Sequence, residues 1–150
     1  AERSLKSAGR GMRTVSLARD SGGTSRVGFG TASLHHLFTS RQRQRLLGRC
    51  LDLGLRHFDT APLYGNGIAE REIGRFVSGR RGEVTIATKF GIEPDPTLAA
   101  KPWLSLPVLG WRRLARALGT ARGAPARRRR FDVDAARRRV ECSLRDLRTD

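Results

Sequence analysis

Three polar side chains stand close to the ends of predicted strands and could handle a proton together. Asp59 and Tyr64 belong to one stretch, residues 54–67, which is typical of a short strand, a tight turn and the start of a helix. Lys89 ends a second apolar run, residues 84–89. A carboxylate, a phenol and an amine at neighbouring strand ends are the groups that a proton-transfer site needs.

The ordinary acidities of these groups indicate what they could do. A tyrosine hydroxyl, with a free pKa of about 10, is a poor proton donor at neutral pH. An ammonium held against the phenol would stabilise the phenolate, and an aspartate paired with the lysine would keep the lysine charged and in place. Such a site could give a proton to a carbonyl oxygen while hydride reaches the carbon, and a cofactor would have to supply that hydride.

The order of the predicted elements indicates how these side chains come together. A hairpin is followed by alternating strands and helices, which specify a parallel sheet with right-handed crossovers. Chemistry in such α/β folds lies at the carboxyl ends of the strands. The expected strands are 14–18, 25–30, 55–60 and 84–89, and the expected helices begin at Thr39, after Gly67 and at Asp132.

Side-chain periodicity predicts which faces are buried. Alternation along strand 55–60 places His57 on the face of Asp59 and turns Phe58 and Thr60 the other way. A histidine one layer below a catalytic carboxylate is expected to be packed and hydrogen-bonded rather than an acid or base. The expected apolar helix stripes are Leu46, Leu47, Cys50 and Leu51; Ala69, Ile73, Phe76 and Val77; and Val133, Ala136, Val140, Leu144 and Leu147.

Polar residues mark where two of these helices begin. Thr39 and Gln42 have the spacing of a capping box. Glu70 and Glu72 in the first turns of the next helix suit the positive end of its dipole.

The sequence Gly28-Phe29-Gly30-Thr31 ends the expected strand 25–30. A dinucleotide fingerprint of the Rossmann type would need a third glycine at the right offset and a helix directly after it, and the sequence has neither. The pattern indicates instead a strand end at which the backbone approaches another group closely.

Residues 92–131 form a long connection that holds five of the six prolines and both tryptophans, Trp103 and Trp111. Connections of this length in a compact domain are usually functional or disordered. We expect a long loop or insertion on the catalytic face, with a short amphipathic helix around 109–118. The two tryptophans would either wall a pocket for a ring-shaped substrate or anchor the loop's own helix.

The chain of 150 residues is strongly basic, with 30 Lys+Arg, 14 Asp+Glu and a net charge of +16. Such a charge is compatible with nucleic-acid binding through the arginines 127–130. The charge is spread evenly, however, since residues 1–91 carry 16 basic and 7 acidic residues and residues 92–150 carry 14 and 7. This distribution favours an arginine-rich composition over a nucleic-acid-binding patch.

Cys50 and Cys142 lie far apart in predicted helices, without the spacing of a zinc site. Reduced packing cysteines are typical of cytosolic proteins, so we expect a cytoplasmic location and no metal. No apolar run approaches the roughly 18 residues of a membrane span. Residues 1–11 are expected to be a disordered tail ahead of the folded part, 12–150. A natural start at Met12 would leave them upstream of the protein. A transit peptide would share their composition.

Four stretches of the sequence resemble the aldo-keto reductase family, and they occur in the family's order and spacing. The resemblance covers about residues 12–91 and 132–150 and leaves 92–131 outside. The stretches are Val27-Gly28-Phe29-Gly30-Thr31-Ala32, residues 54–67, Ile86-Ala87-Thr88-Lys89-Phe90-Gly91 and Ser143-Leu144-Arg145-Asp146-Leu147-Arg148-Thr149-Asp150.

The resemblance implies a TIM-type (β/α)8 barrel that uses NADPH or NADH to interconvert small aldehydes or ketones and alcohols. It implies that Tyr64 is the general acid, that Lys89 lowers the pKa of Tyr64, and that Asp59 holds Lys89. Gly30, Thr31 and Asp59 would lie near the cofactor. The hairpin 14–30 would close the barrel floor, and the style of the motifs is closest to bacterial sugar- or aryl-aldehyde-type members.

The family's fourth catalytic residue, a histidine at the end of the fourth strand, would come after Asp150. A closed barrel of this kind usually needs about 250 residues. We therefore expect the N-terminal hairpin and about three βα units of a reductase, from a truncated or incomplete reading frame, with little or no activity alone. The alternatives are a non-catalytic barrel-derived module that regulates a partner and, less favoured, a basic nucleic-acid-binding protein.

Overall fold

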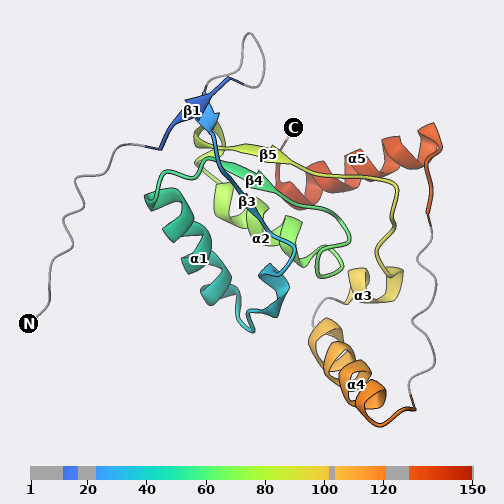
Figure 1. Ribbon diagram of the computed structural model, residues 1–150. Helices are drawn as coiled ribbons and strands as arrows, with labels where there is room; N and C mark the ends of the chain where they lie inside the picture. Colours follow the sequence, from blue (N-terminus) through green and yellow to red (C-terminus); the bar gives the residue numbers. More distant parts are fainter. Residues whose placement is uncertain (1–11, 17–22, 102–103, 121–128, 150) are drawn as a thin grey trace, which may run out of the picture.

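The computed structural model describes residues 12–16, 23–101, 104–120 and 129–149 (Figure 1). The expected disordered tail, 1–11, lies outside the described residues. The strands are β1 (Thr14–Val15), β2 (Thr24–Ser25), β3 (Gly28–Gly30), β4 (His57–Asp59) and β5 (Thr85–Ala87). The helices are η1 (Leu34–His36), α1 (Ser40–Asp52), α2 (Ile68–Val77), η2 (Arg81–Glu83), α3 (Pro96–Ala100), α4 (Ser105–Ala117) and α5 (Val133–Leu147).

Three parallel strands form the centre of the fold, in the order β3-β4-β5. Gly30, Asp59 and Ala87 are paired in register, so the three strands end level with one another. Helix α1 connects β3 to β4 and α2 connects β4 to β5 (Figure 1). The prediction of an α/β fold with a parallel sheet is confirmed. The sheet is open, and the described residues contain no closed barrel.

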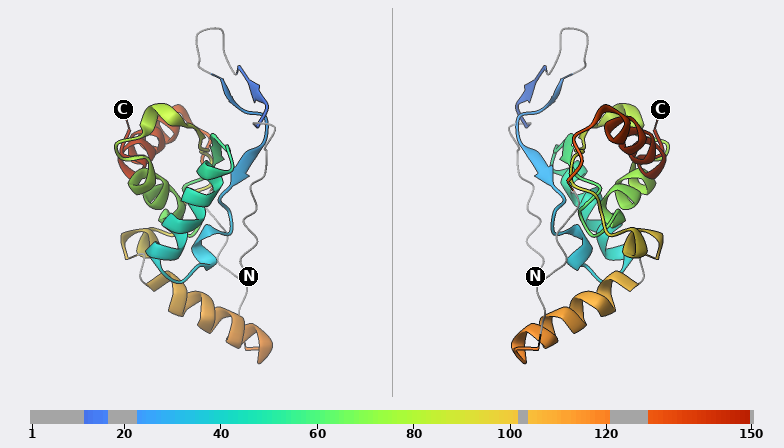
Figure 2. Two further views of the ribbon diagram at one scale, coloured as in Figure 1. Left: turned by 90° about the vertical axis from the view of Figure 1, so that its left-hand side faces the viewer. Right: turned by 90° about the vertical axis from the view of Figure 1, so that its right-hand side faces the viewer.

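The predicted strand 25–30 is wrong in extent, because these residues belong to two strands in two sheets. β2 pairs antiparallel with β1, whereas β3 joins the parallel sheet. Ser25 fixes the bend between them, since its hydroxyl donates to the Val27 carbonyl and accepts from the Arg56 N–H, both at 2.7 Å. Figure 2 shows that the β1–β2 hairpin extends away from the helices.

Helix α1 begins with the predicted capping box. Thr39 Oγ1 accepts from the Gln42 N–H at 3.2 Å, and Gln42 Oε1 accepts from the Thr39 N–H at 3.1 Å. The predicted apolar stripe is partly wrong, because Leu46 is 36% exposed while Arg43 is buried. The guanidinium of Arg43 can be buried because it donates to the carboxylate of Glu72 on α2 at 3.4 Å.

The core lies between the sheet and the helices α1, α2 and α5, and it includes two buried carboxylates on α2. Phe58 and Ile73 are fully buried, and so is Glu70, while Glu72 is 6% exposed. The helix dipole accounts for these glutamates in the sequence but does not predict that they are buried. The Glu72 carboxylate accepts hydrogen bonds from Ser40 and Gln44 of α1. The Glu70 carboxylate accepts one from Thr88, just after β5.

Helix α5 begins at the predicted cap, because Asp132 Oδ1 accepts from the Ala135 N–H at 2.7 Å. The predicted apolar stripe is partly wrong, since Val133 and Val140 are 76% and 49% exposed. The helix is rotated relative to this expectation. Gly74 of α2 permits the close approach of α5, because a Cβ there would lie 2.7 Å from the Leu147 carbonyl carbon. The residues of α5 that are buried are Ala135, Ser143 and Leu147.

The segment 92–131 leaves the sheet after β5 and returns to the same place. Ile92 forms an antiparallel bridge with Arg129, and the Arg130 N–H donates to the Gly91 carbonyl at 2.9 Å. The amphipathic helix expected at 109–118 is α4, which begins earlier, at Ser105. No helix in the described ranges is long and apolar enough to cross a membrane.

Candidate active site

Asp59 and Lys89 form a close ion pair where the parallel strands end. Asp59 is the last residue of β4, and Lys89 follows β5. The Lys89 Nζ lies 2.6 and 2.7 Å from the two carboxylate oxygens of Asp59, and it also donates to the Thr60 carbonyl at 3.1 Å. The level ends of two adjacent parallel strands bring these groups together.

Tyr64 reaches the same place from the turn after β4. The Lys89 Nζ lies 5.1 Å from the centre of its ring, and the ring is half-buried against the core. Residues 65–67 all have left-handed backbone, with φ of 60°, 54° and 87°. Gly65 has no room for a side chain, because a Cβ there would lie 3.0 Å from the His35 Cγ. This tight turn therefore sets the position of the phenol.

The electrostatics of the site keep the lysine protonated. Burial lowers the pKa of the Lys89 ammonium, but the hydrogen bonds and charges of Asp59 and Tyr64 outweigh it and raise the pKa above the ordinary 10.5. The Lys89 and Asp59 side chains are still 47% and 41% exposed. The geometry thus presents a phenol next to a fixed cation at a site that solvent or a ligand can reach.

The two residues predicted to lie near a cofactor differ in their surroundings. Gly30 ends β3, is exposed, and has no atom within 4 Å of the place a Cβ would occupy. Thr31 is fully buried, and its N–H and hydroxyl both donate to the Asp59 carbonyl, at 2.9 and 3.0 Å. Gly30 is therefore open to a ligand, whereas the polar groups of Thr31 hold the end of β4.

His57 lies one layer below Asp59 and is packed among hydroxyl groups. Its Nδ1 is 2.9 Å from the Thr85 Oγ1, which is itself 2.6 Å from the Thr24 Oγ1. The expectation of a packed, hydrogen-bonded histidine is confirmed. In the described ranges, no group of three or more His, Cys, Asp or Glu side chains could hold a metal ion.

The segment 92–131 is attached to the turn that carries Tyr64. The Asp95 N–H donates to the Asn66 Oδ1 at 3.2 Å, and the Leu98 side chain of α3 is buried. Trp111 lies on α4 with 70% of its surface exposed. The other tryptophan, Trp103, lies outside the described residues.

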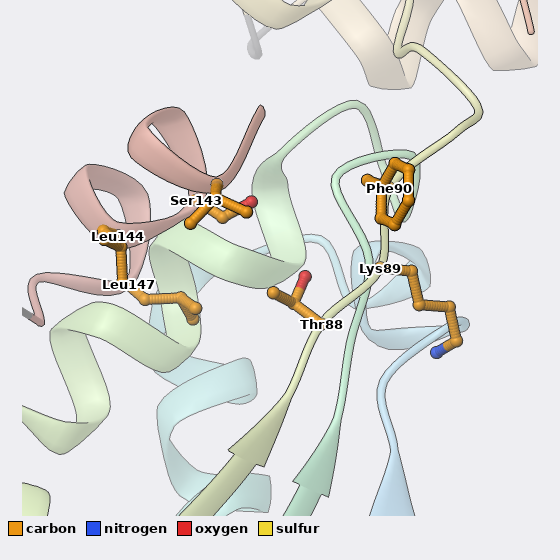
Figure 3. Close-up of a pocket in the computed structure, with 7 residues that line it drawn as sticks. Thr88, Lys89, Phe90, Ser143, Leu144 and Leu147 are labelled. Carbon is orange, nitrogen blue, oxygen red and sulfur yellow. The ribbon is translucent and has the colours of Figure 1, made fainter. Parts of the chain in front are cut away.

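A contact that the sequence did not reveal lies behind the lysine. Thr88 points toward α5 while Lys89 points the opposite way (Figure 3). The Thr88 hydroxyl donates to the buried Glu70 carboxylate at 2.7 Å. A small, mostly apolar pocket of about 100 Å³ lies on this side, away from Asp59; it is lined by Thr88, Lys89, Phe90, Val140, Ser143, Leu144 and Leu147.

Comparison with known proteins supports a relationship to one family. The sequence profile of the Aldo/keto reductase family matches residues 26–150. An aldo-keto reductase of Schizosaccharomyces pombe, named with NADP(+), is 39% identical over 75 residues, which are 47% of this chain and 22% of that protein. A D-threo-aldose 1-dehydrogenase of a Pseudomonas species is 34% identical over 76 residues, which are 47% of this chain and 23% of that protein.

Solved structures are similar to this chain in fold. The holo form of an aldo-keto reductase from Bacillus halodurans gives a TM-score of 0.67 at 25% identity, covering 93% of this chain and 37% of that one. A glycerol dehydrogenase from Gluconobacter oxydans, at 23% identity, is alike in fold, with a TM-score of 0.62 over 91% of this chain and 36% of that one.

The chain spans less than half the length of each of these relatives, and its open sheet is part of a TIM-type barrel fold. Because the family profile covers most of its residues, this protein belongs to the aldo/keto reductase family.

Proposed function

We propose that this chain carries the proton-transfer groups of an NAD(P)H-dependent oxidoreductase that interconverts aldehydes or ketones and alcohols. The contact of Lys89 with both Asp59 and Tyr64 at level strand ends supports this proposal most strongly. The names of two relatives support the same class, since one includes NADP(+) and the other is an aldose dehydrogenase.

Tyr64 is the general acid in the direction of carbonyl reduction. Its hydroxyl gives a proton to the substrate oxygen, and the Lys89 ammonium stabilises the phenolate that remains. Asp59 holds the ammonium in place through both carboxylate oxygens. In the direction of alcohol oxidation, the phenolate takes the proton back. A bound nicotinamide supplies or accepts the hydride, which no side chain can do.

NADPH is the proposed cofactor, with NADH as the alternative. The strand ends fit a nicotinamide ring, because Gly30 is open and lies in register with Asp59 on the neighbouring strand. Thr31 contributes by fixing the Asp59 carbonyl through its N–H and hydroxyl. Gly30 and Asp59 would thus hold the ring within reach of the phenol, while Thr31 fixes Asp59 from the buried side.

The proposed substrate is a small carbonyl compound or alcohol, and Trp103 and Trp111 of the insertion 92–131 would wall its pocket. The attachment of Asp95 to Asn66 supports this role, because it ties the insertion to the turn that carries Tyr64. The exposed ring of Trp111 is free to contact a ligand, which favours this role over anchoring its own helix. A cytoplasmic location stays a prediction.

The test compares three proteins: the 150-residue chain, the same chain continued past Asp150 to the length of its relatives, and the continued chain with Tyr64→Phe. If the reading frame closes at Asp150, the continuation is taken from a relative. Oxidation of NADPH and NADH with a panel of aldehydes is followed by absorbance. We expect turnover by the continued chain, a loss of at least about 100-fold in Tyr64→Phe, and little or none in the 150-residue chain.

Two results would contradict the proposal in different ways. Equal rates with and without the Tyr64 hydroxyl would overturn the assignment of the acid. Cofactor binding by the continued chain, measured by nicotinamide fluorescence, without turnover of any aldehyde would instead favour a non-catalytic module.

A further inference from the structure

A fully buried carboxylate stands directly behind the lysine of the proposed site. Glu70 lies in the first turn of α2 and has no exposed surface. Its Oε1 accepts a hydrogen bond of 2.7 Å from the Thr88 hydroxyl, which comes from the residue immediately before Lys89. Figure 3 shows Thr88 and Lys89 pointing to opposite sides of the same short stretch of chain.

Residues 88–89 follow the end of β5, and the contacts of Lys89 with Asp59 and with the Thr60 carbonyl are all made by its terminal ammonium. Strand β5 ends at Ala87, whose carbonyl accepts the last ladder hydrogen bond to β4, from the Thr60 N–H at 2.8 Å. The Lys89 side chain is half-exposed, and its four-carbon stem is flexible between the ammonium and its base at the backbone. The hydrogen bond from Thr88 to Glu70 fixes that base, because the two side chains extend from adjacent Cα atoms in opposite directions.

Burial of Glu70 costs stability, and its neighbours compensate for it only in part. In the described residues, the Glu70 Oε2 and the Ser143 Oγ of α5 are both buried without a hydrogen-bond partner. Arg139 and Asp146 of α5 also act on the carboxyl, with opposite effects on its pKa. Since an apolar residue would be less costly at such a position, the carboxylate calls for a role beyond packing.

We propose that Glu70 is a positioning residue of the site: through Thr88 it holds the base of Lys89, so that the ammonium stays against Asp59 and Tyr64. This inference rests on the proposed function, in which the Lys89 cation assists the phenol. Glu72, which is buried on the same helix but bonded to α1, should have no such effect.

The chain offers a direct readout, because Tyr64 is its single tyrosine. Ultraviolet absorbance of the phenolate against pH therefore reports on this one group in the 150-residue chain. Lys89→Met is expected to move the titration midpoint up, because it removes the cation next to the phenol. Thr88→Val should also move the midpoint up, by at least half of the shift measured for Lys89→Met. Thr88→Ser and the matched control Glu72→Gln should leave it at the wild-type value.

Thr88→Val leaves the Glu70 carboxylate without a donor, so a double variant, Thr88→Val with Glu70→Met, removes both polar groups. It should recover the melting temperature lost in Thr88→Val but keep the raised midpoint. In the continued chain, Thr88→Val should lower kcat by roughly 10- to 100-fold, with the KM for NADPH changed less than about twofold.

The outcomes separate the two ideas. If Lys89→Met moves the midpoint and neither Thr88→Val nor the double variant does, the positioning role is wrong while the role of Lys89 stands. If Lys89→Met itself has no effect on the midpoint, the proposed function of Lys89 fails first.

Discussion

Both carboxylate oxygens of Asp59 accept hydrogen bonds from the Lys89 Nζ, at 2.6 and 2.7 Å, although the two side chains are about half exposed. Exposed ion pairs generally contribute little to folding stability. The importance of this pair is its geometry, since both oxygens hold the ammonium on the side of the Tyr64 ring. Removing the carboxylate should therefore change the lysine more than the fold.

Asp59→Asn is expected to lower the pKa of the Lys89 ammonium. Burial acts against the charged form of Lys89, and the hydrogen bond to Asp59 is the largest influence that opposes it, with the Asp59 charge adding to it. The chain has three lysines, Lys6, Lys89 and Lys101, so NMR of ¹³C-labelled lysine can follow each ammonium during a titration. One lysine signal should titrate at lower pH in the variant, with the melting temperature nearly unchanged. Three unshifted lysines would contradict this prediction.

Glu70→Gln is expected to remove a pH dependence of stability. Burial raises the pKa of Glu70 above 4.5, with the Asp146 charge acting in the same direction and the Thr88 hydrogen bond and the Arg139 charge opposing it. A raised folded pKa means that the folded state binds the proton more tightly. The stability that this carboxyl contributes to the folded state is therefore fully present below pH 4.5, and it is lost as the pH rises through the pKa of the folded state.

The measurement for Glu70→Gln is the free energy of unfolding in urea at a series of pH values from about 4 to about 8. The free energy of unfolding of the wild type, relative to that of Glu70→Gln, should fall as the pH rises from about 4 towards about 8. Glu72→Gln provides a matched control on the same helix. A difference between wild type and Glu70→Gln that is constant with pH would contradict this prediction, because the pKa of the carboxyl would then be the same in the folded and unfolded states.

The strand-end groups could be predicted from the sequence because local patterns determine them. The alternation along strand 55–60 placed His57 below Asp59, and the turn residues after it placed Tyr64 near the strand end. Adjacent parallel strands then required Asp59 and Lys89 to meet, whatever the details of helix packing. These features depend on short stretches and on one rule of topology.

The buried polar contacts could not be predicted, because each joins residues far apart in the chain. Nothing near Glu70 in the sequence indicates that Thr88 will donate to it, and the same holds for Arg43 and Glu72. The rotation of α5 depends on a missing side chain at Gly74 on another helix. A pattern of apolar residues along α5 alone therefore misplaced Val133 and Val140.

Gly74→Ala and Gly48→Ala should change stability in opposite directions, although both glycines lie inside helices. A Cβ at Gly74 would lie 2.7 Å from the Leu147 carbonyl carbon and would push α5 away, at a cost of about 1–3 kcal/mol. A Cβ at Gly48 would meet no atom within 4 Å, and alanine there should stabilise α1 by about 0.5–1 kcal/mol. Unfolding in urea gives the free energy of unfolding of each variant. A Gly74→Ala variant that is more stable than the wild type would contradict the close packing of α2 on α5.

Asn66→Gly should loosen the first part of the segment 92–131 while leaving the turn that carries Tyr64 intact. Asn66 has a φ of 54°, which glycine adopts without strain, but glycine lacks the Oδ1 that accepts from the Asp95 N–H. Loss of one hydrogen bond of about 1 kcal/mol should speed exchange of the Asp95 amide by about fivefold. Amide hydrogen exchange measures this, with Asn66→Asp as the control that keeps an acceptor oxygen. If the Asp95 amide exchanges at the same rate in both variants, other contacts hold the first part of the segment 92–131, and this hydrogen bond does not tie it to the Tyr64 turn.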